Sequence, residues 1–419
     1  MKKKVLLLFW TILCISHYAA ASNTDVRHKY NFNSDWLLSV GDANGAEQQK
    51  YTDSSWKKVT LPHAFNEDEA FRYSIDELTD TIVWYRKHFR LPAGSEGKKV
   101  FIEFEGVRQA ADFYINGKHI GLHENGVMAV GFDLTPYISY NKENVIALRI
   151  DNNWQYKERG TDTKFQWNDR NFNANYGGLP KNVWLHLTDK LYQTLPLYSN
   201  LKTTGVYIYA ENIRVKSRKA VIHAESEIKN EYRKKQQVAY QVEIQDREGK
   251  IVKTMSGESI TLQPGETAVV KASAEVDNLH FWSWGYGYLY TVKTSLWIDG
   301  KKTDEVTTRT GFRKTRFGNG KIWLNDRVLQ MKGFAQRTSN EWPALGLSVP
   351  AWLSDYSNGL MVECNANLVR WMHVTPWKQD IESCDRVGLI QAMPAGDSEK
   401  DRQGRQWEQR TELMRDAII

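Results

Sequence analysis

The sequence predicts a multidomain fold: two all-β modules followed by the opening of a parallel α/β domain. Residues 146–150 alternate between apolar and polar side chains, as in a half-buried strand, and residues 238–245 repeat this period of two. From about residue 320, strand-like and helix-like patterns alternate instead, which is typical of βαβ units. The composition, 41% hydrophobic and 25% charged, excludes a disordered, collagen-like or coiled-coil chain.

The first 21 residues have the pattern of a secretory signal peptide. Lysines at positions 2–4 precede the apolar run Val5 to Ile15, and Ala19-Ala20-Ala21 is a small-residue cleavage site. The run is shorter than the ~20 residues that cross a bilayer, which argues against a membrane anchor. We therefore expect an exported protein, periplasmic or secreted, without a membrane span. The net charge is +6, part of it in the leader, which is too mild to indicate a nucleic-acid partner.

Residues 22–192 and residues 193–312 are the two predicted β modules. In the first module, Phe113-Tyr114-Ile115 runs into Asn116-Gly117, a strong signal for a two-residue hairpin. The second module has about seven strand-like segments separated by turn signals such as Pro264-Gly265, which is typical of an immunoglobulin-like sandwich.

Residues 313–419 read as the start of a parallel α/β domain. The patterns predict three strands and three helices in alternation, over 328–334, 350–363, 367–374, 380–387, 389–393 and 407–419. The first helix would carry Trp352, Leu353, Tyr356 and Leu360 on one face, and the last would carry Leu413, Met414, Ala417 and Ile418 on one face. A closed (β/α)₈ barrel needs about 250 residues, so this stretch predicts an incomplete TIM barrel of about three βα units, truncated before closure.

The cysteines and histidines do not predict a disulfide framework or a metal site. Outside the leader only Cys364 and Cys384 remain, either as two buried free thiols or as a single bridge. His119 and His123 have a spacing that suits metal ligands on a helix, but they follow a hairpin turn and lie on a strand or loop. No cofactor is evident from the sequence.

Ordered motifs along the chain resemble glycoside hydrolase family 2, the family of β-galactosidases, β-glucuronidases and β-mannosidases. They include Trp84-Tyr85-Arg86-Lys87, Phe104-Glu105-Gly106-Val107, Tyr176-Gly177-Gly178-Leu179, Thr310-Gly311-Phe312-Arg313 and the run Asn365 to His373. The resemblance implies a jelly-roll-like sugar-binding sandwich, an immunoglobulin-like sandwich and a (β/α)₈ catalytic barrel. It also implies β-galactosidase-like hydrolysis with retention, an oligo- or polysaccharide substrate, and a homo-oligomer as one option for the full-length form.

The resemblance assigns no catalytic residue within this chain. In the family both catalytic Glu residues lie near the ends of barrel strands four and seven, so we expect the 419-residue chain to lack both and to be inactive alone. Glu341, Asp397 and Glu399 follow predicted barrel strands, but their spacing does not make a matched pair, and we interpret them as ordinary loop charges.

The resemblance does imply several substrate-binding residues. Arg370 and His373 match positions that contact the active-site carboxylates and the sugar, with a structural ion pair as the alternative for each. Ala335-Gln336-Arg337-Thr338 departs from the usual Asn-Arg-His-Glu-type turn and places Arg337 where the family has His. A guanidinium there would suit a carboxylated or decorated sugar, or would pair with a neighbouring acid.

Two further candidates have structural alternatives. Asn367 contacts substrate or forms a hydrogen bond at the start of its strand. Asp169, close to Trp167, contacts the sugar or packs within its loop. The competing functional hypotheses are a non-catalytic carbohydrate-binding protein and a structural module that mediates assembly. The motifs at 365–389 favour the enzyme, because a binding protein needs no barrel strands.

Overall fold

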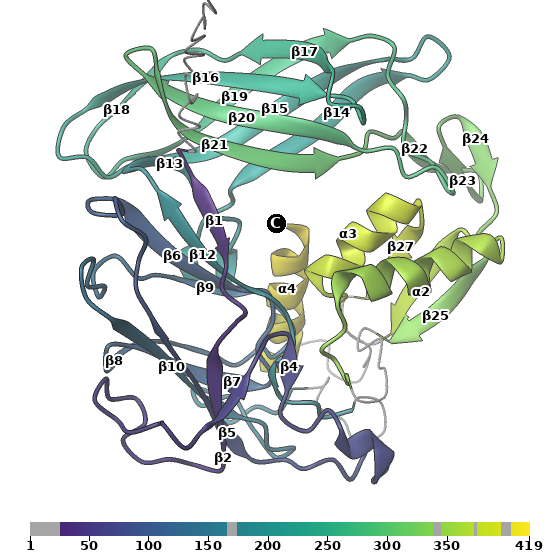
Figure 1. The fold of residues 1–419 in the computed structure, drawn as a ribbon. Helices are drawn as coiled ribbons and strands as arrows, with labels where there is room; N and C mark the ends of the chain where they lie inside the picture. The colour runs from purple at the N-terminus through teal and green to yellow at the C-terminus, as the bar shows by residue number, and fades with distance from the viewer. Residues whose placement is uncertain (1–25, 166–173, 338–344, 373–374, 395–403) are drawn as a thin grey trace, which may run out of the picture.

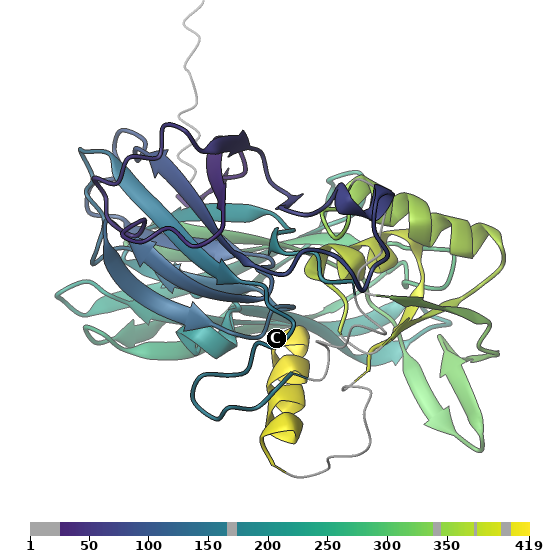
Figure 2. The same cartoon turned by 90° about the horizontal axis from the view of Figure 1, so that it is seen from below.

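The computed structural model describes residues 26–165, 174–337, 345–372, 375–394 and 404–419. Two β-sandwiches and a smaller α/β region pack against one another (Figure 1). The second sandwich runs across the top of the view, the first lies at the lower left, and the α/β region lies at the right. Figure 2 shows helix α4 below the other elements, beside loops of the first sandwich. Within the described residues, no helix is both long enough and apolar enough to cross a bilayer.

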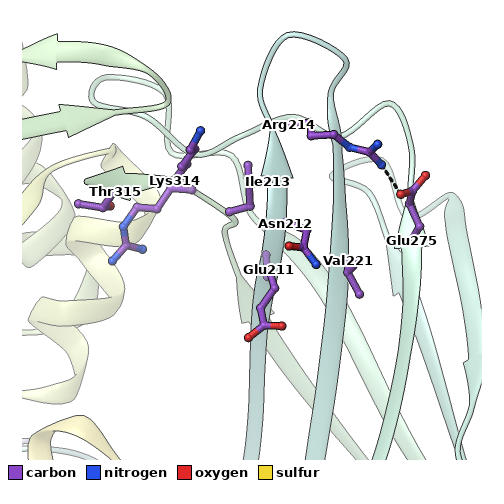
Figure 3. A pocket seen from close by; sticks show the side chains of 10 residues that line it. Glu211, Asn212, Ile213, Arg214, Val221, Glu275, Lys314 and Thr315 are labelled. Atoms are coloured by element: carbon purple, nitrogen blue, oxygen red, sulfur yellow. Dashed lines mark hydrogen bonds and ion pairs between the residues drawn. The ribbon is translucent and has the colours of Figure 1, made fainter. Parts of the chain in front are cut away.

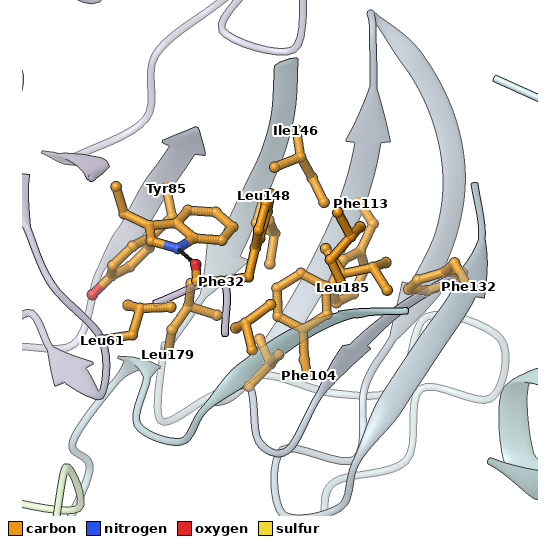
Figure 4. Close-up of a cluster of buried hydrophobic side chains, with 14 of the residues drawn as sticks. Phe32, Leu61, Tyr85, Phe104, Phe113, Phe132, Ile146, Leu148, Leu179 and Leu185 are labelled. Atoms are coloured by element: carbon orange, nitrogen blue, oxygen red, sulfur yellow. Dashed lines mark hydrogen bonds between the residues drawn. The ribbon is translucent and has the colours of Figure 1, made fainter. Parts of the chain in front are cut away.

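The first sandwich consists of antiparallel sheets with the strand orders β1-β12-β6-β9, β3-β2-β5-β10-β7-β8 and β11-β4. The elements are β1 (His28–Asn31), β2 (Trp36–Val40), β3 (Lys57–Val59), β4 (His63–Ala64), η1 (Glu69–Phe71), β5 (Ile82–Phe89), β6 (Lys99–Phe104), β7 (Ala110–Ile115), β8 (Lys118–His123), β9 (Val130–Asp133), β10 (Asn144–Asp151), β11 (Gly178–Leu179) and β12 (Val183–Thr188). Its core lies between the two larger sheets and includes Phe104, Phe113 and Leu185 (Figure 4).

The hairpin predicted at Asn116-Gly117 is confirmed, whereas the strand predicted over residues 146–150 is more deeply buried than its alternation indicated. Asn116 and Gly117 join β7 to β8 with φ values of 50° and 81°, as the mirror-image turn of a hairpin requires. Strand β10 is central, and residues 144–148 are buried on both faces. The second face is covered because Ala147 packs with Ala46 and Trp84, so a long loop shields what the alternation predicted to be solvent-facing.

The second sandwich has two sheets, one with strands β13, β14 and β19 on β15, and one in the order β17-β16-β20-β21 with β18 on β16. The strands are β13 (Leu191–Gln193), β14 (Val206–Arg214), β15 (Lys219–Asn230), β16 (Gln236–Gln245), β17 (Ile251–Ser256), β18 (Ile260–Leu262), β19 (Thr267–Val276), β20 (Tyr290–Ile298) and β21 (Lys301–Thr310), with the short helix α1 (Tyr198–Leu201) between β13 and β14. Val238, Tyr240, Val242 and Ile244 are buried in its core, as their alternation predicts.

The third region contains a small antiparallel sheet followed by three parallel strands and three helices. Its elements are β22 (Thr315–Gly318), β23 (Lys321–Leu324), β24 (Arg327–Leu329), β25 (Gly333–Arg337), α2 (Ala351–Glu363), β26 (Leu368–Met372), α3 (Lys378–Val387), β27 (Ile390–Ala392) and α4 (Arg405–Ile418). The parallel order is β25-β26-β27, which fits the first three strands of a barrel.

The first predicted barrel strand was placed wrongly. Residues 328–334 do not form one strand. Val328 and Leu329 belong to β24, which pairs antiparallel with β23, and the parallel strand β25 begins only at Gly333. The apolar run therefore spans two elements with different partners.

The exposure of α2 also differs from what its apolar face suggested. Trp352, Tyr356 and Leu360 are 68%, 55% and 42% exposed, and of the four predicted residues only Leu353 is buried. The polar residues Ser354 and Asn358 instead pack on α3, where they donate hydrogen bonds to Asp380 at 2.8 Å and to Ser383 at 2.9 Å. The apolar stripe is thus turned away from its helical neighbour.

The last helix and the cysteines complete the comparison with the sequence. In α4, Leu413 is fully buried, whereas Ile418 is 74% exposed. Cys364 and Cys384 are free thiols, so the predicted alternative of a disulfide between them is not formed. Cys384 is buried, but Cys364 is exposed, because it directly follows the end of α2.

Candidate functional site

The parallel sheet β25-β26-β27 turns its carboxyl ends toward the first sandwich. Residues Ala335, Arg370 and Ala392 are aligned across the three strands. The polypeptide that follows β25 then packs on the first sandwich, where Lys181 Nζ donates a 2.8 Å hydrogen bond to the carbonyl of Leu347. Parallel α/β sheets bind their ligands at the carboxyl ends of the strands. The candidate site therefore lies between these strand ends and the first sandwich.

Arg370 is the candidate residue that the structure describes most fully. It is the third residue of β26 and is exposed, while its neighbours Val369 and Trp371 are fully buried on the side of the helices. The Trp371 indole N–H donates a 3.0 Å hydrogen bond to the Gln391 side chain, which fixes that face of the sheet. The guanidinium therefore extends from the opposite face of the sheet, the face that a barrel would enclose.

The other predicted residues have different placements. Arg337 is the last residue of β25, aligned with Met372 at the carboxyl end of β26. Asn367 precedes β26, is buried, accepts a hydrogen bond from Lys332 N at 2.9 Å and donates one to the Gln330 carbonyl at 2.8 Å. Its amide thus holds the amino end of the strand, the structural role that the sequence also allowed. Predicted residues that lie outside the described residues are Trp167, Asp169, Glu341, His373, Asp397 and Glu399.

The described residues supply neither a carboxylate pair nor a metal centre at the strand ends. The described residues that directly follow the three strands, at 345–350, 375–377 and 393–394, include no carboxyl group. Among the described residues there is also no cluster of three His, Cys, Asp or Glu side chains that could hold a metal ion. His119 pairs with Asp112 at 3.1 Å, and burial lowers the pKa of His123 to about 4.

A buried ion network fixes the α/β region against the first sandwich. Glu103 in β6 accepts hydrogen bonds from His186 Nε2 at 2.9 Å and from Lys378 Nζ at 3.2 Å. Lys29 Nζ lies 3.8 Å from the same carboxylate. Burial alone would raise the pKa of Glu103, but Lys378, His186 and Lys29 together hold it well below its ordinary value. The first residue of α3 is thereby tied to the sandwich.

Two further buried charged groups, Lys181 and Asp380, lie beside this network. Burial lowers the pKa of Lys181 to about 8, although the Asp380 and Glu105 charges oppose the change. Burial likewise raises the pKa of Asp380, against the effect of Lys181. Lys181 also lies 5.3 Å from the centre of the Trp377 ring. These contacts were not predicted from the sequence, because residues so far apart along the chain leave no local pattern.

A separate surface hollow of about 760 Å³ lies along strand β14 of the second sandwich (Figure 3). Most of its charged side chains have ionic partners: Arg214 pairs with Glu275, and Glu211 lies 3.3 Å from His223. The Arg313 guanidinium lies 5.5 Å from the centre of the Trp282 ring. Lys314 pairs with Asp326 at 2.7 Å. The hollow therefore offers no reactive group and is not the candidate site.

Comparison with known proteins connects this geometry to one family. The model described as "Glycosyl hydrolases family 2, sugar binding domain" matches residues 37–188, and the model "Glycosyl hydrolases family 2" matches residues 206–313. A beta-glucuronidase of Formosa agariphila is 35% identical over 405 residues, which cover 94% of this chain and 40% of the relative. A beta-galactosidase of Thermoanaerobacter pseudethanolicus is 28% identical over 376 residues, which cover 87% of this chain and 46% of the relative.

A solved structure from the same family has a similar fold. "The structure of a beta-glucuronidase from glycoside hydrolase family 2" superposes with a TM-score of 0.88 at 33% identity, covering 94% of this chain and 42% of that one. This chain thus spans less than half the length of these similar proteins.

Proposed function

Since this chain belongs to glycoside hydrolase family 2, we propose that it forms the sugar-binding part and the first barrel strands of an exported β-glycosidase. The observation that supports this most strongly is the parallel sheet β25-β26-β27, with the exposed Arg370 on the face that a barrel would enclose. The family membership accounts for both sandwiches, and the sheet supplies the beginning of a catalytic domain.

The proposed reaction is hydrolysis of a β-glycosidic bond with retention. Such a reaction needs two carboxyl groups ~5–5.5 Å apart, one as the nucleophile that forms a glycosyl-enzyme and one as the acid and base. The described residues that follow the three strands carry no such pair. We therefore propose that both carboxylates belong to further barrel strands and that the 419-residue chain alone does not turn over substrate.

Arg370 and Arg337 have proposed roles in binding. A guanidinium beside a nucleophilic carboxylate keeps that carboxylate ionised, which is the role we propose for Arg370. Arg337, at the end of β25, would bind a sugar carboxylate through paired hydrogen bonds. Since similar proteins are named as beta-glucuronidases and beta-galactosidases, Arg337 makes the β-glucuronide our preferred substrate over the β-galactoside.

Nitrophenyl β-glucuronide and nitrophenyl β-galactoside test these proposals. We expect no hydrolysis by the 419-residue chain. Where sequencing of the locus shows an open frame beyond codon 419, we expect hydrolysis by the longer protein. In that longer protein, Arg337→Gln should lower kcat/KM for the glucuronide more than for the galactoside. Heat-sensitive hydrolysis that co-purifies with the 419-residue chain would contradict the proposal, and an equal loss on both substrates would remove the role of Arg337.

A further inference from the structure

The loop between β4 and β5 presents two aromatic side chains to solvent. Phe71, at the end of η1, is 67% exposed, and Tyr73 is 52% exposed. Arg72 and Ser74 beside them are exposed as well. Single exposed aromatic residues are common on protein surfaces. Phe71 and Tyr73, however, lie only two positions apart and have polar neighbours, so together they form a surface that can bind a ligand.

The loop is held in a fixed conformation. The Asn66 amide donates hydrogen bonds to the carbonyls of Thr79 and Asn175, both at 3.0 Å. The backbone N–H of Thr79 donates to the Glu69 carboxylate at 2.7 Å. Leu78 is only 2% exposed and anchors the base of the loop. The exposure of Phe71 and Tyr73 is therefore a property of an anchored loop, and binding there would order little additional chain.

The same loop lies at the candidate site. Leu78 packs in one cluster with Tyr176 and with Leu347, which belongs to the connection between β25 and α2. Ala70 and Ile75, on either side of the exposed pair, pack against this cluster. In Figure 1 the arrowhead of β25 points toward the end of the molecule that carries η1. The aromatic pair thus stands at the rim of the carboxyl-end face.

We propose that Phe71 and Tyr73 form a binding subsite for a β-linked oligosaccharide, which holds sugar units beyond the one bound at the strand ends. This inference rests on the proposed function. The C–H face of a pyranose ring packs on an aromatic ring, while its hydroxyl groups need donors and acceptors close by. The exposed Arg72 guanidinium offers donors, while the Ser74 hydroxyl, which already donates to the Asp76 carboxylate, and that carboxylate itself offer acceptors.

The position of Phe71 and Tyr73 favours a carbohydrate ligand over a protein partner. The loop lies within residues 37–188, the part that matches a sugar-binding domain, and it packs through Leu78 on Leu347 of the connection that follows β25. A chain of sugars leaving the strand ends on this side would pass over the loop. A protein partner or a second copy of the chain would need no such alignment with the strand ends.

Titration calorimetry on the 419-residue chain tests the subsite without any need for hydrolysis. The probes are a tetrasaccharide of alternating glucuronate and N-acetylglucosamine with β-linked glucuronate at its non-reducing end, β-1,4-galactotetraose, and the monosaccharides glucuronate and galactose. We expect at least one tetrasaccharide to bind more tightly than its monosaccharide. The double variant Phe71→Ala/Tyr73→Ala should weaken that tetrasaccharide on the order of tenfold, the loss expected for two aromatic contacts.

Phe317→Ala is the matched control, because Phe317 is 74% exposed in β22, outside the loop. It should leave tetrasaccharide binding unchanged, and thermal unfolding should show that all variants fold. The inference is overturned if the wild-type chain binds no tetrasaccharide more tightly than its monosaccharide, or if the double variant binds as the wild type does. It is also overturned if the double variant instead abolishes dimerisation in sedimentation experiments while sugar binding is unchanged. Each result is independent of the hydrolysis assay, so the subsite can fail while the proposed function stands.

Discussion

Replacing Lys378 by Met tests whether the buried ion network holds the α/β region on the first sandwich. Lys378 is the first residue of α3, and its ammonium lies 3.2 Å from the buried Glu103 carboxylate. The substitution leaves that carboxylate with His186 and Lys29, at 2.9 and 3.8 Å. The helix should then open more readily from the sandwich.

The free energy lost on replacing Lys378 should lie between the values for a fully buried and for an exposed ion pair. Removing one partner from a fully buried pair costs about 3–5 kcal/mol. The Lys378 side chain is 40% exposed, so solvent screens it, and two other partners remain. We therefore expect about 1–2 kcal/mol, which makes the amide hydrogens of α3 exchange roughly 5–30 times faster in native-state exchange.

The effect should depend on pH in a defined direction. The pKa of Glu103 is lowered in the folded chain, so the stabilisation is present above its ordinary value of 4.5 and is lost as the pH falls below it. The difference between wild type and Lys378→Met should therefore be full at pH 7 and narrow below pH 4.5. Lys321→Met, at an exposed position of β23, is the control. Exchange from α3 that changes no more than in this control would refute the reasoning.

Three further substitutions test other contacts. Burial raises the pKa of Asp385 from 3.8 to about 6, so the ionised carboxylate favours the unfolded state increasingly as the pH rises from 3.8 to above 6. Asp385→Asn should therefore raise the free energy of unfolding, measured with urea, by up to about 3 kcal/mol at pH 8 and leave it unchanged near pH 4. Gly287→Ala would place a Cβ only 2.1 Å from the Arg386 carbonyl oxygen, so the melting temperature should fall. A melting temperature unchanged from wild type would mean that the backbone at residue 287 moves away from Arg386 without cost. The double substitution Trp352→Lys/Tyr356→Lys removes two exposed apolar side chains from α2, so light scattering should show less aggregation at an unchanged melting temperature. Aggregation equal to that of the wild type would mean that the chain aggregates through another surface.

The sequence predicts those parts of the fold that depend on local pattern. The Asn116-Gly117 hairpin and the alternation from Val238 to Ile244 are confirmed, because a turn type and a strand period are both set by neighbouring residues. The division of the Val328–Phe334 run could not be predicted, since apolarity alone does not show which partner each half takes.

The candidate site shows the same limit more strongly. Arg370 lies on a parallel strand, as its motif indicates. Arg337, which the motifs assigned to a turn after the first strand, is instead the last residue of β25. The bond between Lys378 and Glu103 joins residues 275 positions apart, for which no local pattern exists. The face of α2 that carries Trp352 is apolar yet exposed, since hydrogen bonds from Ser354 and Asn358 orient the helix on α3. Helical amphipathicity identified the stripe but not the direction in which it points.

Expression of the reading frame through and beyond codon 419, with assays on nitrophenyl β-glucuronide and nitrophenyl β-galactoside, tests the central claim most directly. The account predicts that the frame continues through further barrel strands that supply two carboxylates, that this longer protein hydrolyses at least one of the two substrates, and that the 419-residue chain hydrolyses neither. Three results would contradict it: a stop that ends the frame at codon 419, hydrolysis by the 419-residue chain itself, or a longer protein with the added strands and no activity on any β-glycoside.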